Sequence, residues 1–170
     1  MDFRRTPPSH PHTAATAMVA NTPYLVMLLL GAASIILGLR SSGAAWGLAA
    51  GYVVYGILGA LWIILFLCPH CPSFGKWTCP CGYGVLSARL RRQGDTSRFG
   101  REFKRHIAVI VPLWIIPLVL GGIGLARGFS WPAAGVLAAF VLNSFVILPL
   151  VSRIHGCKDC AQREDCPWMK

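Results

Sequence analysis

The sequence contains very little charge. Of its 170 residues only 13% are Asp, Glu, Lys or Arg, whereas 55% are hydrophobic. A soluble globular domain carries about 25% charged residues, so this composition excludes an ordinary soluble enzyme or binding domain. Acidic residues are the scarcest, with 6 Asp and Glu against 16 Lys and Arg, which leaves a formal net charge of +10. Such an excess is typical of proteins that contact nucleic acid or anionic lipid, and the long apolar runs favour lipid.

Four long stretches contain no charged residue and no histidine. They cover residues 24–39, 46–67, 107–126 and 131–151. With the neutral residues that precede the first run, each can cross a hydrocarbon layer of about 30 Å as a helix. The sequence therefore predicts an all-α integral membrane protein with four transmembrane helices. Because these runs lack Asp, Glu, Lys, Arg and His, an intramembrane proton relay, an ion site and a bis-histidine haem are excluded.

The apolar runs divide the chain into five segments. These are a flexible N-terminal tail (1–21), two transmembrane helices (22–67), a Cys-rich loop (68–106), two more transmembrane helices (107–151) and a Cys-rich tail (152–170). The N-terminal tail contains prolines and a Ser/Thr/Ala-rich stretch without a helical period, so we expect His10 and His12 to be solvated. Walker, Rossmann and Ser-His-Asp motifs are missing from the sequence.

The basic residues predict which side of the membrane the loop faces. Four crossings place both termini and the loop on the same side. Only Arg40 and Arg127 lie on the opposite side, and the other fourteen of the 16 basic residues lie on the side of the loop. By the positive-inside rule, both termini and the loop are predicted to be cytoplasmic. The expected location is the plasma membrane or an inner membrane.

Small residues, prolines and one amide predict how the four helices pack. The second run has small residues at four-residue spacing, which let helix backbones approach closely. These are Gly47 with Gly51 and Gly56 with Ala60. In the third run, Pro112 and Pro117 predict a kink whose freed carbonyls are satisfied by neighbouring helices. In the fourth run, Asn143 predicts a hydrogen bond between helices.

Two short amphipathic helices are predicted within the loop. The more basic one has apolar residues at Phe99, Phe103 and Ile107, with arginine and lysine on its other faces. The shorter one contains Val85, Leu86 and Leu90, and Gly94 and Asp95 separate the two. A basic amphipathic helix lies at a membrane interface, where anionic headgroups attract it. The lipid bilayer with anionic headgroups is therefore an expected partner, and nucleic acid is not.

All seven cysteines lie in two polar segments that follow apolar runs. The loop contains Cys68, Cys71, Cys79 and Cys81, and the tail contains His155, Cys157, Cys160 and Cys166. The C-x2-C pairs resemble the metal-binding knuckles of rubredoxins and zinc ribbons, over about four residues at a time. Cysteines that face a reducing cytoplasm do not persist as disulfides. These eight residues are therefore predicted to ligate metal, either as two four-ligand sites or with the C-x2-C pairs joined in one crossed site.

The spacing leaves two classes of cofactor open. Four cysteines precede proline, as does the last cysteine of a bacterial ferredoxin run, but no ferredoxin spacing is present. Zinc needs no particular spacing, and sites of four cysteines or of three cysteines and one histidine are ordinary for it. The predicted cofactor is thus zinc or an iron–sulfur cluster. His70, inside the first pair, is expected beside the site or exposed more than as a ligand.

Chemistry confined to one face of an apolar bundle favours anchoring and electron relay over transport. The first hypothesis is a small membrane metalloprotein that serves as an electron-transfer or accessory subunit and docks a larger protein partner on the cytoplasmic side. The second is a structural, zinc-stabilised membrane scaffold. The third is a membrane thiol oxidoreductase, because C-x2-C pairs exchange disulfides.

Overall fold

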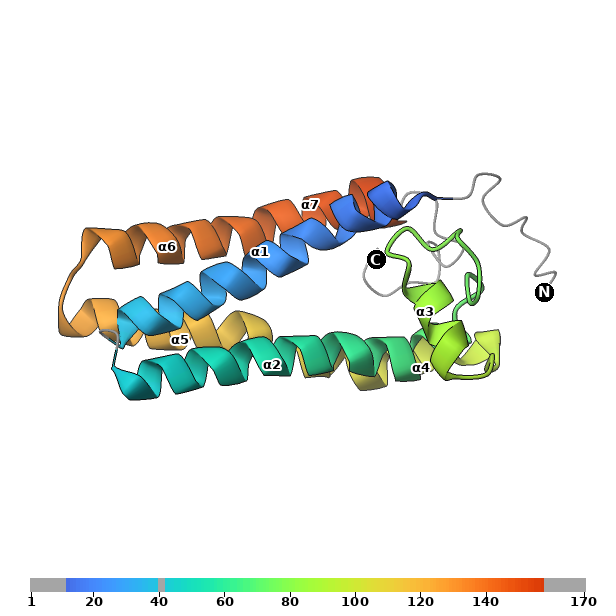
Figure 1. Cartoon of the computed structure of the whole chain (residues 1–170), viewed down its shortest axis with the longest axis horizontal. Coiled ribbons are helices and arrows are strands. Elements are labelled where there is room, and N and C mark those ends of the chain that lie inside the picture. Colours follow the sequence, from blue (N-terminus) through green and yellow to red (C-terminus); the bar gives the residue numbers. More distant parts are fainter. Residues whose placement is uncertain (1–11, 40–41, 158–170) are drawn as a thin grey trace. The chain divides into compact units, whose positions relative to one another are not determined.

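The structure is a computed structural model that describes residues 12–39 and 42–157, and within these ranges every regular element is a helix (Figure 1). The α-helices are α1 (Ala14–Gly38), α2 (Gly43–Phe66), α3 (Tyr83–Leu90), α4 (Phe99–His106), α5 (Pro112–Arg127), α6 (Trp131–Leu142) and α7 (Leu148–Val151). Shorter 3-10 segments are η1 (Cys68–His70), η2 (Thr96–Arg98) and η3 (Ile107–Ile110), and π-helical segments are η4 (Asn143–Ile147) and η5 (Ser152–Cys157).

Four helical stretches of the described chain are long and apolar enough to cross a membrane. They are Ala14–Gly38, Gly43–His70, Thr96–Arg127 and Trp131–His155. This confirms the predicted all-α class with four membrane-length helices. The two short helices predicted within the loop are also present, as α3 and α4.

The first helix begins earlier than the sequence predicts. The predicted tail extends to residue 21, but α1 begins at Ala14. The Thr13 hydroxyl accepts a hydrogen bond from the Thr16 N–H at 3.3 Å, as an N-cap residue does. The alanines that follow have the highest helix propensity of any residue, so they extend the helix. Residues 1–11, which contain His10, lie outside the described ranges.

The chain forms two compact units. One, the bundle unit, consists of Thr22–Gly59 and Val109–Leu150. The other, the cysteine unit, contains, among the described residues, 12–21, Ala60–Ala108 and 151–157. Each unit therefore joins segments that are far apart in the sequence.

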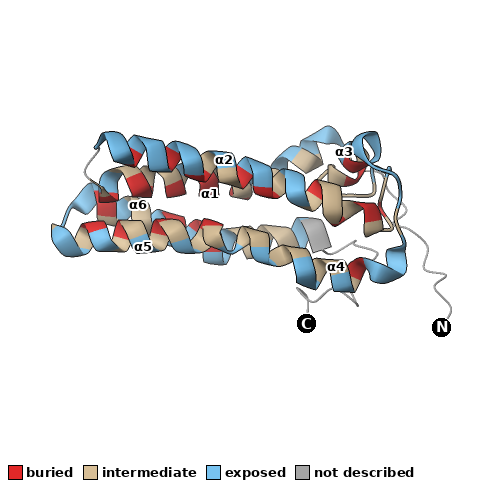
Figure 2. Cartoon of the chain, turned by 90° about the horizontal axis from the view of Figure 1, so that it is seen from below, coloured by how far each residue is buried: buried red, intermediate tan, exposed pale blue. Residues whose placement is uncertain are grey.

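The bundle unit has a small apolar core. It is formed by Met27, Leu28, Ile35, Ala49, Tyr52, Leu113 and Phe140. Figure 2 shows the buried residues as stripes along these helices, with exposed residues on the remaining faces. Many of the exposed residues are large and apolar, such as Leu29, Val54 and Ile115. An apolar outer surface of this kind fits a lipid environment.

Small residues allow close helix contacts in the bundle unit, but partly at other positions than the sequence predicts. A Cβ atom on Gly47 or Gly51 would meet nothing within 4 Å among the described atoms, so these two glycines do not pack as predicted. Gly56 packs against Leu28. On α1, a Cβ on Gly38 would lie 2.8 Å from the Leu120 carbonyl oxygen. Close packing of small residues therefore joins α1 to α5.

Polar side chains of the bundle unit donate to carbonyls of other helices. Pro117 has no N–H, so the Leu113 carbonyl loses its usual helical donor. The Tyr52 hydroxyl replaces it, at 3.0 Å. The Asn143 side-chain amide donates to the Pro23 carbonyl at 3.0 Å, which confirms the predicted hydrogen bond between helices. These bonds satisfy backbone groups that lipid cannot satisfy.

Replacing Tyr52 with phenylalanine will destabilise the protein by about 1 kcal/mol, because the Leu113 carbonyl loses its donor. The dependence on Pro117 can be tested with a double-mutant cycle. In a Pro117→Ala background residue 117 regains an N–H that can donate to Leu113, so the cost of Tyr52→Phe should fall below about 0.5 kcal/mol. Unfolding free energies measured in mixed micelles give all four values. An equal cost in both backgrounds would contradict this account.

Candidate metal centre

Three Cys-Pro pairs of the loop open tight turns. The carbonyl of Cys68 accepts a hydrogen bond from the Cys71 N–H at 3.1 Å, and that of Cys71 accepts from Phe74 at 3.0 Å. The carbonyl of Cys79 accepts from Gly82 at 3.0 Å. In each turn proline occupies the second position, where its fixed φ is favourable. These three Cys-Pro pairs therefore have a structural role as the first two residues of tight turns.

Gly82 ends the last of these turns in a left-handed conformation. Its φ is +72°, a region that side chains with a Cβ rarely adopt. It also immediately precedes α3. A glycine at this position therefore lets the chain turn directly from Cys81 into the helix.

The four loop thiols lie near one another. Cys68 is within electrostatic range of the other three: Cys71, Cys79 and Cys81. All four are partly buried, and none of them forms a disulfide. Their side chains do not yet converge as ligands, since no three His, Cys, Asp or Glu side chains of the described chain are placed to hold a metal ion. The structure thus gathers the thiols without forming a coordination sphere.

Helix α3 supports the loop from one side. The Gly84 carbonyl accepts a hydrogen bond from the Gly75 N–H at 3.0 Å. A Cβ on Gly84 would clash with the Ser73 carbonyl and lie 3.3 Å from the Cβ of Cys79. Helix α3 also packs on η1, which begins with Cys68. Both halves of the cysteine set are therefore attached to the same short helix.

The start of α1 supports the loop as well. The Asn21 side-chain amide donates to the Cys81 carbonyl at 3.1 Å, and the His12 N–H donates to the Trp77 carbonyl at 2.8 Å. The His12 Nε2 atom is buried and has no hydrogen-bond partner among the described residues, so this nitrogen is not solvated as the sequence predicts. No local signal links Asn21 or His12 to residues about sixty positions away.

His70 is held by the segment that separates α3 from α4. Its Nδ1 lies 2.9 Å from the Asp95 carbonyl oxygen, which can only accept, so Nδ1 carries the ring proton. The Gly94 N–H donates to the Pro69 carbonyl at 3.0 Å, and a Cβ on Gly94 would collide with the His70 ring. A ring oriented by a backbone carbonyl through one nitrogen is typical of histidines at metal sites.

The Asp95 carboxylate orders this segment. Ser97 donates to Asp95 Oδ1 from its hydroxyl at 2.7 Å and from its N–H at 2.9 Å. These two bonds hold the pKa of Asp95 below its usual value, and Arg98 adds to the effect. The carboxylate therefore stays ionised, and caps η2, well into the acidic range.

The predicted tail ligands lie at the limit of the described chain. His155 is exposed and lies in η5. Cys157 is the last residue of that segment, and Cys160 and Cys166 lie outside the described ranges. A metal site formed by the tail, alone or together with the loop, stays a prediction.

The described residues define a helical protein with four membrane-length apolar helices and a unit that gathers four cysteines. Comparison with protein-family models, curated proteins and solved structures finds no match for this chain. Functional inference therefore depends on the cysteine unit itself.

Proposed function

We propose that this chain is a small membrane metalloprotein whose loop cysteines bind a metal, either zinc or an iron–sulfur cluster, beside the membrane. The observation that carries the proposal is the gathering of four thiols, with Cys68 in electrostatic range of the other three. Four thiolates are a complete ligand set for one tetrahedral ion or one cluster. The metal would draw the thiols together and release their protons.

The role that fits this site is that of an electron-transfer or accessory subunit that anchors a larger partner. The four apolar runs lack Asp, Glu, Lys, Arg and His, so they offer no path for a charged solute. The chemistry of the chain is instead concentrated in polar segments outside the membrane. The bias of fourteen basic residues toward one side supports a cytoplasmic location for the termini and the loop.

A structural zinc site is the second candidate, and the support that the loop receives from two helices favours it. Asn21 of α1 and Gly84 of α3 both hold the loop backbone near its cysteines. A metal at this position would tie α1, α2 and α3 together. Such a site would stabilise a membrane scaffold without any redox change.

Anaerobic purification followed by elemental analysis and an absorption spectrum tests the proposal. If the protein binds zinc, we expect about one or two ions per chain. If it binds an iron–sulfur cluster, we expect iron in place of zinc. A broad absorption band at about 400 nm that bleaches on reduction would indicate an iron–sulfur cluster and support the electron-transfer role. Colourless protein with stoichiometric zinc would support the scaffold. Folded, metal-free protein with all seven thiols reactive would contradict both.

A further inference from the structure

A cluster of aromatic rings marks the end of α2. The rings of Trp62 and Phe66 have centroids 4.3 Å apart, and Phe66 stacks on His106 at 5.5 Å. The Trp62 indole N–H donates to His106 Nδ1 at 3.1 Å. Tryptophan and other amphipathic rings concentrate at the boundary between hydrocarbon and water. For a helix as apolar as α2, this cluster indicates the level of the membrane surface.

Helix α3 is attached to that level at its C-terminal end. The guanidinium carbon of Arg91, the residue after α3, lies 5.2 Å from the centroid of the Phe66 ring. The Arg91 N–H donates to the Ser87 carbonyl at 2.8 Å, so the arginine continues the last turn of the helix. The cation–π contact therefore places the end of α3 beside the end of α2.

The two sides of α3 differ in character. Gly84 and Ser87 are buried, whereas Leu86 and Leu90 are 40% and 53% exposed. The two leucines are four residues apart and so lie on the same side of the helix. Arg89, beside them, is also exposed. The outward side of α3 thus combines apolar and basic side chains, as interfacial helices do.

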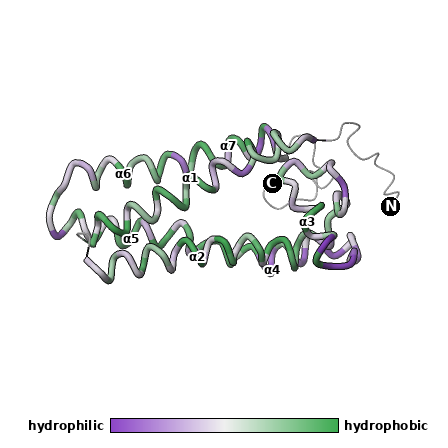
Figure 3. The backbone as a smooth tube through the Cα atoms, in the orientation of Figure 1, coloured by the Kyte–Doolittle hydropathy of each residue, from purple (hydrophilic) through white to green (hydrophobic). Residues whose placement is uncertain are grey.

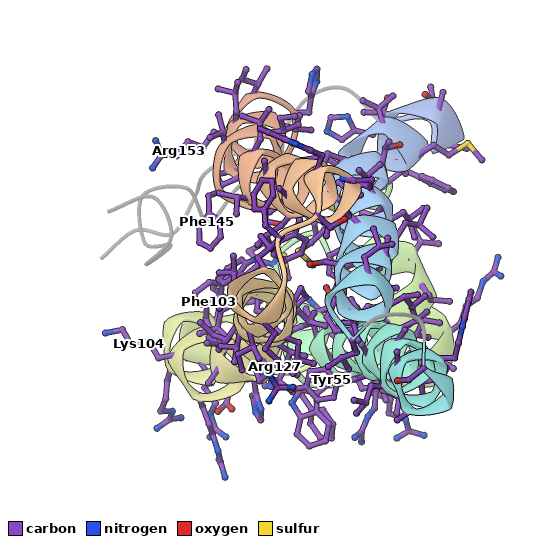
Figure 4. The ribbon with its side chains drawn as sticks, turned by 90° about the vertical axis from the view of Figure 1, so that its left-hand side faces the viewer. Tyr55, Phe103, Lys104, Arg127, Phe145 and Arg153 are labelled. Atoms are coloured by element: carbon purple, nitrogen blue, oxygen red, sulfur yellow. The ribbon has the colours of Figure 1, made fainter. Side chains whose placement is uncertain are left out.

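The charge around α3 is not neutralised within the loop. Residues 68–106 contain eight basic residues but only two acidic ones, Asp95 and Glu102. Asp95 lies 3.5 Å from Arg98, and Glu102 lies 3.3 Å from His106. Figure 3 shows hydrophilic residues concentrated in the segment that contains α3 and α4, and Figure 4 shows Lys104 of α4 pointing away from its helix. Within the described loop, neither carboxylate is therefore within ion-pair distance of Arg89, Arg91 or Arg92.

We propose that α3 lies on the membrane surface and binds anionic phospholipid. Leu86 and Leu90 enter the boundary of the acyl chains, and Arg89, Arg91 and Arg92 bind the phosphates. An acidic protein surface would match the charge, but a bilayer whose surface lies at the level of the aromatic cluster would be adjacent to α3 and would accept the leucines as well. This inference concerns a different surface from the thiols and does not depend on whether a metal is bound.

The test uses the full chain in lipid nanodiscs, with an environment-sensitive fluorescent amino acid in place of Leu90. A second protein carries it in place of Gln93, which is exposed and lies beyond α3. In discs that mix phosphatidylglycerol into phosphatidylcholine, emission from position 90 should shift to the blue and be quenched by spin-labelled acyl chains. Emission from position 93 should remain closer to that of a probe in water.

Charge variants separate binding by α3 from a general attraction. We expect the triple variant Arg89→Gln, Arg91→Gln and Arg92→Gln to need at least about five times more phosphatidylglycerol to reach half of the maximal blue shift at position 90. The matched control, Arg101→Gln, Lys104→Gln and Arg105→Gln on α4, should change that amount by less than about twofold, because headgroup contacts made by α4 do not hold position 90 at the membrane surface. A water-like signal at position 90 in every disc would overturn the proposal, as would equal effects of the two triple variants. So would a blue shift that appears only when an acidic protein is added.

Discussion

The proposed loop site predicts that replacing Cys68 and Cys79 with serine will abolish metal binding by the loop and loosen the loop backbone. Each substitution takes a thiolate from a different turn, so neither half of the cysteine set keeps two thiols in the arrangement that a tetrahedral ion needs. A structural metal contributes on the order of 10 kcal/mol to a site of this kind. The loss should therefore be close to complete. The metal-to-protein ratio measures it directly.

Susceptibility to protease reports the structural consequence of that loss. Lys76 lies between the first and second pairs of loop cysteines. Without metal, this segment keeps only weaker support, such as the hydrogen bonds from the Asn21 side-chain amide to the Cys81 carbonyl and from the Gly75 N–H to the Gly84 carbonyl, and the packing of α3. Trypsin should therefore cleave after Lys76 at least about tenfold faster in the double variant than in the parent protein. A chelator should produce the same increase in the parent protein and none in the variant.

The tail cysteines supply the matched control. Serine at Cys157, Cys160 and Cys166 removes three thiols from the chain but none from the loop. If the loop is a complete site, this variant keeps the metal bound by the loop and resists trypsin at Lys76 as the parent does. Loss of all metal in the tail variant would instead establish one crossed site formed by both segments. Unchanged metal content in the Cys68 and Cys79 variant would refute a loop site altogether.

The elements that the sequence predicts well are those decided by local chemistry. The uncharged runs produce membrane-length helices because a backbone in lipid must satisfy its own hydrogen bonds. The division between α3 and α4 follows from Gly94 and Asp95, which favour turns. The Asn143 hydrogen bond was predictable for a similar reason, since a lone amide in an apolar run needs a partner from another helix.

The positions that could not be predicted depend on how the helices are rotated about their axes. Gly38 and Gly47 have the same chemistry, yet only Gly38 meets a neighbouring backbone. The local sequence does not distinguish the two glycines, because the packing of the whole bundle decides which face of each helix points toward a neighbouring helix. The contacts of His12 and Asn21 with the loop were missed for the related reason that they join distant segments.

One irregular element has a local cause that the periodicity does not reveal. The fourth apolar stretch passes through π-helical geometry at Asn143–Ile147. Pro149 follows in α7 and cannot donate to the Phe145 carbonyl four residues before it. A wider turn before the proline relieves the clash between its ring and that carbonyl. The hydropathy of the run is unaffected, so the run still appears to be one continuous helix.

Replacing Gly124 with valine should destabilise the bundle unit by about 3 kcal/mol or more, because the new side chain has no space. A Cβ at this position would collide with the backbone of Gly38 on α1, which cannot rotate away as a side chain can. The helices would have to separate, and the close contacts around Gly38 and Gly121 would be lost with them. Denaturant titration in mixed micelles measures the loss as a change in unfolding free energy.

Gly122 provides the control for this prediction, since it lies on the same helix and a Cβ there would meet nothing within 4 Å of the described atoms. Gly122→Val changes helix propensity by the same amount as Gly124→Val. Its effect on stability should therefore stay within about 0.5 kcal/mol, and the difference between the two variants isolates the steric contact from the backbone effect. Equal destabilisation by both substitutions would show that α1 and α5 do not meet through Gly38 and Gly124. A large loss for Gly124 alone would establish that contact as the point where the two helices are held together.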